Sequence, residues 1–276
     1  MAAAARRRLD QELLRRETVE SREQARALIV GGHVTVNGAP TTKPARQVTA
    51  GDAIVVLQTP RFVGRGGHKL EGALDAFGLE VMGASCLDVG SSTGGFTDAL
   101  LQRNAASVIA VDVGTHQLHE RLRSNPQVDV REQTDIRTVG PDDIPSPVDV
   151  VVCDVSFIGL DQVLPTMLAL CTPTADLVLL IKPQFEAGRQ EVSKGRGVIR
   201  DPAIWARVLE ESAQAVHTFG GRVVQACVSP LKGGSGNVEF FFHVQPASGD
   251  RTEADEDALV AGFDSEALAA AADDLP

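Results

Sequence analysis

Residues 84–97 read Ala-Ser-Cys-Leu-Asp-Val-Gly-Ser-Ser-Thr-Gly-Gly-Phe-Thr, and this stretch decides the fold of the chain. A short apolar run ends at an acid, a glycine-rich turn follows, and an amphipathic segment continues from Phe96 to about Asn104. The pattern predicts a strand, a turn and a helix. Such units hold nucleotide-like ligands at the carboxyl edge of an α/β sheet, because glycines let the backbone approach the ligand.

The spacing of the glycines discriminates between ligands. Gly90, Gly94 and Gly95 form G-x-x-x-G-G, whereas dinucleotide-binding turns read G-x-G-x-x-G. Asp88 at the strand end would repel a pyrophosphate but attract a cationic or hydroxylated ligand. S-adenosylmethionine (SAM) carries an ammonium and a sulfonium and no phosphate, so the turn predicts a SAM site. NAD is the competing ligand, and a turn that binds nothing is the structural alternative.

Two further acids follow predicted strands. Asp112 ends the apolar run of residues 108–112, where it can take the hydroxyls of a ribose. Asp135 follows residues 128–131 and is placed to flank an adenine ring. Acids at three successive strand ends favour a nucleoside-type ligand. The residues predicted to bind SAM are Asp88, Gly90, Ser91, Ser92, Thr93, Gly94, Gly95, Phe96, Asp112, Val113, Asp135 and Asp154.

Helices and strands alternate after residue 68. We expect helices at 68–77, 96–104, 116–122, 161–170 and 202–219, and strands at 84–89, 107–112, 127–131, 148–153, 175–181, 222–228 and 238–244. Short crossovers predict a mainly parallel sheet with helices on both faces. Because no helix joins the last two strands, one of them is expected to run antiparallel at an edge. This α/β layout is the Rossmann-like one of class I SAM-dependent methyltransferases.

Two lysines and two acids gather at the edge where the acids lie. Asp154 and Lys182 follow predicted strands, Glu239 lies in the last strand, and Lys69 begins the first helix. Each alone is equally compatible with a surface ion pair or a helix cap. Together, beside a nucleoside site, they predict a catalytic group.

The chemistry that suits this group is O-methylation. A ribose hydroxyl is a poor nucleophile, so a base must take its proton. A lysine serves only after losing its own proton, which a second cation and burial favour and neighbouring carboxylates oppose. The sequence therefore leaves open whether Lys69 or Lys182 is the base. No metal-ligand spacing occurs, and the four cysteines lack C-x-x-C spacing, which favours reduced thiols in a cytoplasmic protein.

Charge is divided unevenly along the chain. The net charge of 276 residues is −11, yet residues 1–65 carry 11 Lys and Arg against 6 Asp and Glu. This basic segment favours an RNA-binding module over a merely solvated surface. The tail 247–276 carries 1 basic residue against 9 acidic ones and is expected to be disordered. No run approaches the length of a membrane helix, so no membrane partner is expected.

The basic segment has the pattern of a small α+β domain. We expect a helix at 8–16, a second helix opened by Ser21 with Gln24 in a capping box, and strands at 33–36 and 53–57. The segment resembles the S4 RNA-binding domain through Arg8-Leu9-Asp10, Ser21-Arg22-Glu23-Gln24-Ala25 and residues 29–38. The resemblance implies that RNA phosphates are contacted by Arg6, Arg8, Arg22 and Lys43.

The second part of the chain resembles the FtsJ-like RNA ribose 2′-O-methyltransferases through its Lys-Asp-Lys-Glu group. With the S4 segment, it is similar to the haemolysin-A/TlyA family, which shares Gly-Gly-His-Lys-Leu (66–70), the turn at 88–97, Asp-Val-Ser-Phe-Ile (154–158), Ile-Lys-Pro-Gln-Phe-Glu (181–186) and Gly-Asn-Val-Glu-Phe (236–240). The resemblance implies 2′-O-methylation of cytidines in ribosomal RNA of assembled subunits, by a protein expected to be a monomer. Some relatives read Arg-x-Trp-Val where this chain has Pro60-Arg61-Phe62-Val63, so a SAM-linked role of that segment is in doubt.

The expected organisation is an S4-like domain at 1–59, a linker at 60–67, a methyltransferase domain at 68–246 and the acidic tail. Two alternatives stay open. One is a non-enzymatic ribosome factor that binds SAM and RNA. The other is a membrane-lytic haemolysin, which neither a signal, a membrane span nor a basic amphipathic helix supports.

Overall fold

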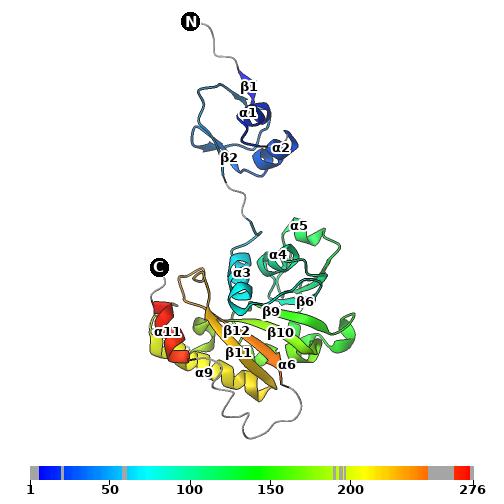
Figure 1. The fold of residues 1–276 in the computed structure, drawn as a ribbon, viewed down its shortest axis with the longest axis vertical. Helices are drawn as coiled ribbons and strands as arrows, with labels where there is room; N and C mark the ends of the chain where they lie inside the picture. The colour runs from blue at the N-terminus through cyan, green and yellow to red at the C-terminus, as the bar shows by residue number, and fades with distance from the viewer. Residues whose placement is uncertain are drawn as a thin grey trace. The chain divides into compact units, whose positions relative to one another are not determined.

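The structure is a computed structural model and describes residues 6–19, 22–57, 61–188, 191–192, 195, 197–247 and 264–273. The chain divides into two compact units, residues 1–61 and 62–276, each with a core of its own (Figure 1). We describe each unit by itself.

The first unit packs two helices on short strands. In chain order its elements are β1 (Arg7–Arg8), α1 (Leu9–Arg15), α2 (Arg22–Val30), β2 (Val34–Val36), β3 (Ala39–Pro40), β4 (Gln47–Val48) and β5 (Ile54–Val56). β1 pairs with β4, and β2 lies between β3 and β5. Leu9 and Leu13 of α1 meet Ile29 of α2 in the core. The α+β prediction for this unit is confirmed, and Arg8 belongs to a strand and not to the helix.

The hairpin at Asn37-Gly38 forms as its sequence predicts. Both residues have positive φ, 55° and 79°, the combination that joins two antiparallel strands with the right twist. Only glycine adopts this conformation without strain, and asparagine tolerates it best among the other residues. The predicted capping box of Ser21 and Gln24 lies outside the described residues.

The second unit is built on a seven-stranded sheet. Its elements are α3 (Gly66–Phe77), β6 (Ser85–Val89), α4 (Gly95–Gln102), β7 (Ser107–Val111), α5 (Glu120–Arg123), β8 (Val128–Arg131), the 3₁₀ turns η1 (Ile136–Thr138) and η2 (Pro141–Asp143), β9 (Val148–Cys153), α6 (Leu160–Leu170), β10 (Cys171–Ile181), α7 (Pro183–Glu186), α9 (Pro202–Thr218), β11 (Gly221–Val228), β12 (Phe240–Pro246) and α11 (Ser265–Asp273).

The strand order is β11-β12-β10-β9-β6-β7-β8, and β12 alone runs against its neighbours. The expectation of one antiparallel strand is confirmed, but its place at the edge is wrong because β12 lies between β10 and β11. Phe240, Phe241 and Phe242 are all fully buried, which fits a strand covered on both faces and not an edge strand.

Helices cover both faces of this sheet, as predicted. Alternate residues of each strand enter opposite clusters, so Val150 packs with α3 and α4 while Val151 packs with α6 and α9. In β12 the same alternation sends Phe241 to the first cluster and its two neighbours to the second. Because parallel strands end at one edge, this packing fixes where the acids after β6, β7 and β9 lie.

Two expectations differ from the structure. The predicted helix 116–122 is reduced to α5, because the backbone N–H groups of residues 116–118 donate to the Glu132 carboxylate and not along a helix. Part of the tail that was expected to be disordered forms α11, which packs beside α9 (Figure 1). Ala269 and Ala272 of α11 are buried there. Alanine side chains are small, yet these two join the hydrophobic core of the domain.

Candidate active site

The glycine-rich turn after β6 brings two segments into close contact. Gly90 has φ +84°, and a Cβ added there would lie 2.7 Å from the Asp154 carbonyl oxygen. Only glycine fits both the backbone angle and the space. The turn that follows β6 and the turn that follows β9 therefore touch directly, and together they form one wall at the carboxyl edge of the sheet.

Asp88 lies buried beneath this turn. Its Oδ2 accepts hydrogen bonds from the backbone N–H (2.9 Å) and the hydroxyl (2.6 Å) of Thr97. Its Oδ1 is buried and has no hydrogen-bond partner among the described residues. Burial raises the pKa of Asp88 to about 7, although the Thr97 hydrogen bonds oppose that rise. A buried acceptor left open in this way is suited to a ligand that carries a donor or a positive charge.

Asp112 after β7 joins the turn at β6 to the next loop. One carboxylate oxygen accepts from the backbone N–H of Ser92 at 2.8 Å, and the other accepts from that of Gly114 at 2.7 Å. Ser92 in turn donates its hydroxyl to Gln117 at 3.2 Å. Asp112, Ser92 and Gln117 all line one cavity, and these hydrogen bonds fix its rim.

That cavity has a volume of about 410 Å³, which is within the range of small-ligand sites. Six of the residues predicted to bind SAM line it, namely Gly90, Ser92, Asp112, Val113, Asp135 and Asp154. Val113 is exposed and presents an apolar surface there. Asp135 is paired with Arg137 and caps η1, so part of its carboxylate is already engaged.

The other predicted residues of the turn do not line this cavity. Gly94 packs against Leu118 and Leu122, and Gly95 packs against Gly66 and Gly67 of α3. The Phe96 ring lies 6.2 Å from that of Phe241 in the core. Ser91 is buried as well, and the Thr93 carbonyl accepts from the His119 N–H at 3.2 Å. These five residues shape the turn and do not reach the cavity.

The four polar residues predicted from the strand ends come together as two ion pairs. Lys182 pairs with Asp154, and its Nζ also donates to the Val155 carbonyl oxygen at 2.8 Å and the Ser156 hydroxyl at 3.0 Å. Lys69 pairs with Glu239. Lys69, Lys182 and Glu239 are buried.

The two pairs act on one another. Burial raises the pKa of the Asp154 carboxyl, Lys182 beside it opposes the rise, and the charges of Lys69 and Glu239 act on the same carboxyl. Gln184 donates to Glu239 at 3.3 Å and links the second pair to α7. The structure thus joins two cations and two anions in one partly desolvated cluster beside the cavity.

Sequence reasoning missed Phe157, which lines the cavity. It has φ +65° and is 90% exposed, and its ring centroid lies 4.8 Å from that of Phe185. An aromatic ring this exposed, in a backbone conformation that a bulky residue rarely adopts, is a signature of a functional loop. The motif at 154–158 contains Phe157, but nothing in the sequence marks its ring as exposed, because that exposure arises from the backbone angle.

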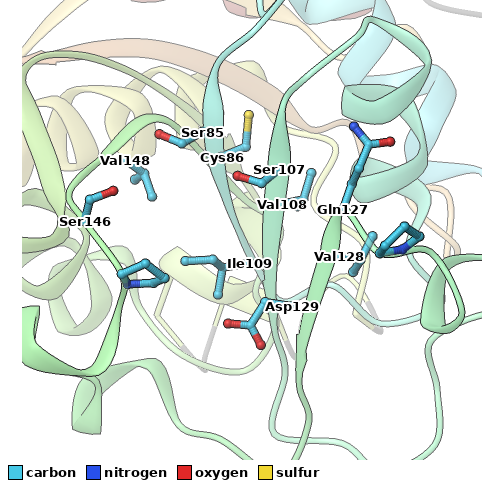
Figure 2. A pocket seen from close by; sticks show the side chains of 12 residues that line it. Ser85, Cys86, Ser107, Val108, Ile109, Gln127, Val128, Asp129, Ser146 and Val148 are labelled. Carbon is cyan, nitrogen blue, oxygen red and sulfur yellow. The ribbon is translucent and has the colours of Figure 1, made fainter.

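A second, smaller cavity of about 200 Å³ lies at the opposite edge of the sheet. Figure 2 shows its lining, which comes from the residues where strands begin, including Ser85, Ser107, Val128 and Val148. It contains neither of the lysine–acid pairs. The carboxyl edge is the one that carries the candidate chemistry.

Glu132 orders the loop that forms the far rim of the larger cavity. It accepts from the N–H groups of His116 (2.8 Å), Gln117 (2.8 Å) and Leu118 (3.1 Å) and from Arg123 (2.8 Å). The Arg123 guanidinium and these N–H groups lower the pKa of Glu132 to about 2.

We expect Glu132→Gln to weaken SAM binding several-fold, because an amide nitrogen cannot accept from the backbone N–H groups that the carboxylate now orders. Isothermal titration with SAM measures the change, and Glu80→Gln, at an exposed carboxylate before β6, is the matched control. Equal SAM affinity in Glu132→Gln and wild type would contradict this role.

Glu186 at the end of α7 fixes the loop that carries Phe157. Its carboxylate accepts from the Leu160 N–H at 3.2 and 3.4 Å and so caps α6. Burial raises the pKa of Glu186 to about 7, the Leu160 N–H opposes the rise, and Asp161 adds to it.

A pH dependence of stability follows from this shift. Between the ordinary value of 4.5 and about 7, the native chain keeps a proton on Glu186 that the unfolded chain releases. The contribution of this group to the free energy of unfolding is therefore largest below pH 4.5 and falls as pH rises to about 7. We expect Glu186→Gln, which keeps an oxygen for Leu160, to remove that fall. Urea titrations give the free energy of unfolding at each pH across this window. Parallel curves of that free energy against pH for Glu186→Gln and wild type would refute the prediction. The control Glu80→Gln should give a curve parallel to wild type.

Among the described residues, no helix is long and apolar enough to cross a membrane. The same part of the chain contains no group of three or more His, Cys, Asp or Glu side chains that could hold a metal ion.

The fold and the site define a class of protein. A parallel sheet with one reversed strand beside its edge, a glycine turn after β6 and acids at the ends of β6 and β7 are the features of class I SAM-dependent methyltransferases. The residues fit the cofactor: Asp112 and Asp154 line the cavity, and Asp88 keeps an unpartnered buried oxygen beneath the glycine turn, which together suit a cationic ligand that bears hydroxyls.

Comparison with known proteins agrees. The chain matches the model of the FtsJ-like methyltransferases over residues 62–245 and that of the S4 domain over residues 7–54. It is 47% identical to the 16S/23S rRNA (cytidine-2′-O)-methyltransferase TlyA of Mycobacterium tuberculosis, over 86% of this chain and 89% of the relative. Hemolysin A of Brachyspira hyodysenteriae is 40% identical over 86% of this chain and 98% of the relative. A hemolysin-type protein of known structure from Streptococcus thermophilus has a TM-score of 0.72 at 35% identity, over 98% of this chain and 96% of that one.

The chain belongs to the TlyA/haemolysin A family, whose members join an S4 domain to an FtsJ-like methyltransferase domain. The predictions of family, fold class and SAM as cofactor are confirmed.

Proposed function

We propose that this protein transfers a methyl group from SAM to the 2′-hydroxyl of cytidines in ribosomal RNA of assembled ribosomal subunits. The observation that carries the proposal is the pair of lysine–acid ion pairs, Lys182–Asp154 and Lys69–Glu239, beside the acid-lined cavity. The relative from M. tuberculosis bears the name of this activity for 16S and 23S rRNA. Cytidine as the target rests on that relative, whereas ribose methylation rests on the site.

In this proposal the larger cavity holds SAM, which supplies a methyl group made electrophilic by its attachment to a sulfonium. Asp88, buried beneath the turn and outside the lining, acts on the positive charge from behind the turn, and Asp112 takes ribose hydroxyls. Gly90, Ser92 and Asp154 form the wall, and Val113 and Asp135 flank the adenine. Ser91, Thr93, Gly94, Gly95 and Phe96 set the conformation of the turn.

Lys182 is the base that accepts the proton of the 2′-hydroxyl at Nζ. Asp154, the Val155 carbonyl and the Ser156 hydroxyl fix the position of Nζ beside the cavity, so the amine is held where the proton must be taken. Lys69 adds a second positive charge to the cluster. Glu239 pairs with Lys69, so it holds that lysine in place and partly offsets the positive charge of the lysine.

Phe157 gives the site an exposed aromatic face. Bases of single-stranded or extruded nucleotides stack on such rings. The position of Phe157 on the cavity rim, next to the Asp154 turn, suits the base of the nucleotide whose ribose is methylated.

The N-terminal module supplies RNA affinity. In this proposal residues 1–59 form the S4 domain, residues 60–67 connect it to the catalytic domain at 68–246, and Arg6, Arg8, Arg22 and Lys43 contact phosphates. Such contacts give affinity more than sequence choice. The protein acts as a monomer in the cytoplasm, where ribosomal subunits are assembled.

The experiment is to delete the gene and map 2′-O-methyl groups on ribosomal RNA by resistance to alkaline hydrolysis. The proposal expects one or more cytidines to lose protection and to regain it when the intact gene is returned. Restoration by a copy that encodes Lys182→Ala would contradict the assigned base, and an unchanged map after deletion would contradict the function.

A further inference from the structure

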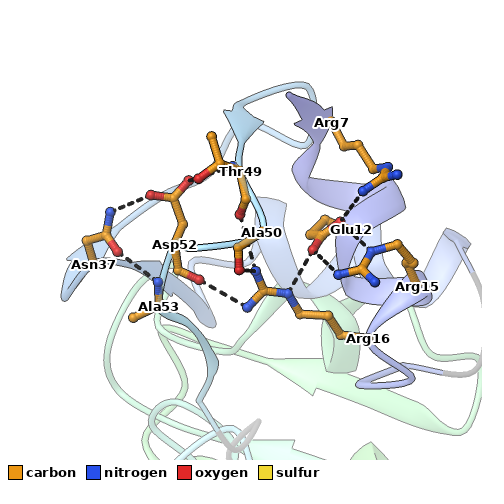
Figure 3. Close-up of polar contacts among 9 residues, drawn as sticks. All are labelled: Arg7, Glu12, Arg15, Arg16, Asn37, Thr49, Ala50, Asp52 and Ala53. Atoms are coloured by element: carbon orange, nitrogen blue, oxygen red, sulfur yellow. Dashed lines mark hydrogen bonds and ion pairs between the residues drawn. The ribbon is translucent and has the colours of Figure 1, made fainter. Parts of the chain in front are cut away.

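A buried glutamate lies at the centre of three arginines in the S4 domain (Figure 3). Glu12 of α1 is 1% exposed. Its oxygens accept from Arg15 (2.8 and 2.6 Å) and from Arg16 (2.9 Å), and Arg7 lies 3.9 Å away. Hydrogen bonds from Arg15 and then Arg16 lower the pKa of Glu12 to about 2, against the effect of burial, so the carboxylate stays charged at any physiological pH.

One of the three arginines has a structural task. Arg16 donates to the carbonyl oxygens of Asp52 (3.0 Å), Thr49 (3.3 Å) and Ala50 (3.1 Å), and it is 24% exposed. Asp52 is itself bonded to Asn37 and Thr49, as Figure 3 shows. The Arg16 guanidinium therefore ties α1 to the turn before β5.

The other two arginines face solvent. Arg7 is 47% and Arg15 is 49% exposed, and one carboxylate cannot neutralise all three cations around it. Arg15 binds Glu12 through Nε and one terminal nitrogen, and half of its side chain is exposed. The bidentate bond also restrains a side chain that would otherwise lose conformational entropy on binding.

Two of the arginines assigned to RNA above, Arg8 and Arg22, do not belong to this group. Arg8 and Arg22 are held by Asp10, a different buried acid of the same helix. Positions two apart on a helix point in different directions, so Asp10 and Glu12 organise two separate sides of α1.

We propose that Arg7 and Arg15 form a second contact surface for RNA phosphates and that Glu12 is the positioning residue that holds them. The inference rests on the proposed RNA substrate. Guanidinium groups match phosphate oxygens in geometry, and an ion-paired Arg7 in β1 with a bidentate Arg15 on α1 let the domain hold the backbone at more than one place.

The test is the salt dependence of binding to purified ribosomal subunits by the full chain. For the double variant Arg7→Gln/Arg15→Gln, we expect affinity to fall roughly tenfold and the slope of log K against log salt to become shallower by about 2, one per phosphate contact. The double variant Arg207→Gln/Arg222→Gln removes the same charge from the catalytic domain and should leave the slope unchanged. Equal slopes for the two double variants would overturn the proposal.

A second variant tests the positioning role by the sign of its effect. Glu12→Gln removes one negative charge, so charge alone would tighten RNA binding, whereas loss of positioning weakens it. We expect weaker binding with the same SAM affinity, measured on protein whose unfolding transition is intact. Tighter binding would overturn the role of Glu12.

If wild type itself binds subunits without salt dependence, the RNA-binding function fails and this inference fails with it. A steep wild-type slope that does not change in the arginine variant overturns the inference alone.

Discussion

Lys182→Ala is expected to lower the rate of methyl transfer by about 10³-fold or more while SAM binds as in wild type. General base catalysis contributes roughly 10²–10⁴-fold to such reactions, and removal of Lys182 also leaves Asp154 in a partly desolvated site without its cation. Lys182 contacts the cavity lining through Asp154 and is not itself among the lining residues, so the cofactor keeps its contacts. Single-turnover rates with labelled SAM, beside SAM titrations, measure the two effects separately.

Two further variants decide what the lysine does. Lys182→Arg keeps the positive charge but cannot lose a proton, so it should fail to restore the rate. Lys69→Ala should lower the rate less than Lys182→Ala, because Lys69 acts through the charge of the cluster. A rate in Lys182→Ala within tenfold of wild type, or a larger loss in Lys69→Ala, would show that Lys182 is not the base.

Gly90→Ala is expected to destabilise the catalytic domain by roughly 2–4 kcal/mol and to remove measurable SAM binding. The left-handed backbone at φ +84° disfavours alanine, and the new Cβ would lie 2.7 Å from the Asp154 carbonyl oxygen and 3.2 Å from the Val155 nitrogen. Both are backbone atoms of the turn that carries Asp154, so relief of the overlap moves the cavity wall and the Lys182–Asp154 pair together.

Gly78→Ala is the matched control for this change. Gly78 ends α3 with φ +65°, and nothing lies within 4 Å of an added Cβ. It therefore carries the backbone strain without the collision, and should cost about 1 kcal/mol with unchanged SAM affinity. Thermal unfolding and SAM titration compare the two variants. If Gly90→Ala behaved like Gly78→Ala, close approach of the two turns would have no part in the site.

The pattern of acids and glycines could be read from the sequence because it is local. A strand, an acid and a glycine turn within residues 84–97 determine their own conformation, and parallel strands bring their ends to one edge. For that reason the sequence alone could place Asp88, Gly90, Asp112 and Asp154 at one edge of the sheet. The four-residue cluster at the edge followed from the same argument.

What the sequence did not reveal depends on contacts between distant residues. The pairing of Lys69 with Glu239 joins residues 170 positions apart and requires β12 to enter the sheet beside β10. The predicted helix at 116–122 is shortened because the Glu132 carboxylate accepts hydrogen bonds from the backbone N–H groups of residues 116–118. Glu132 lies later in the sequence, so this interaction could not be read from the segment itself. The Phe157 ring is exposed only because of its backbone angle.

The most direct test of the central claim is transfer of labelled methyl from SAM to purified small and large ribosomal subunits, with wild type and Lys182→Ala in parallel. The account predicts label on a ribose 2′-oxygen, in a nucleotide resistant to alkaline hydrolysis, with wild type and almost none with Lys182→Ala. No label on either subunit with wild type that binds SAM would contradict it, and would leave a SAM-binding RNA factor in place of an enzyme.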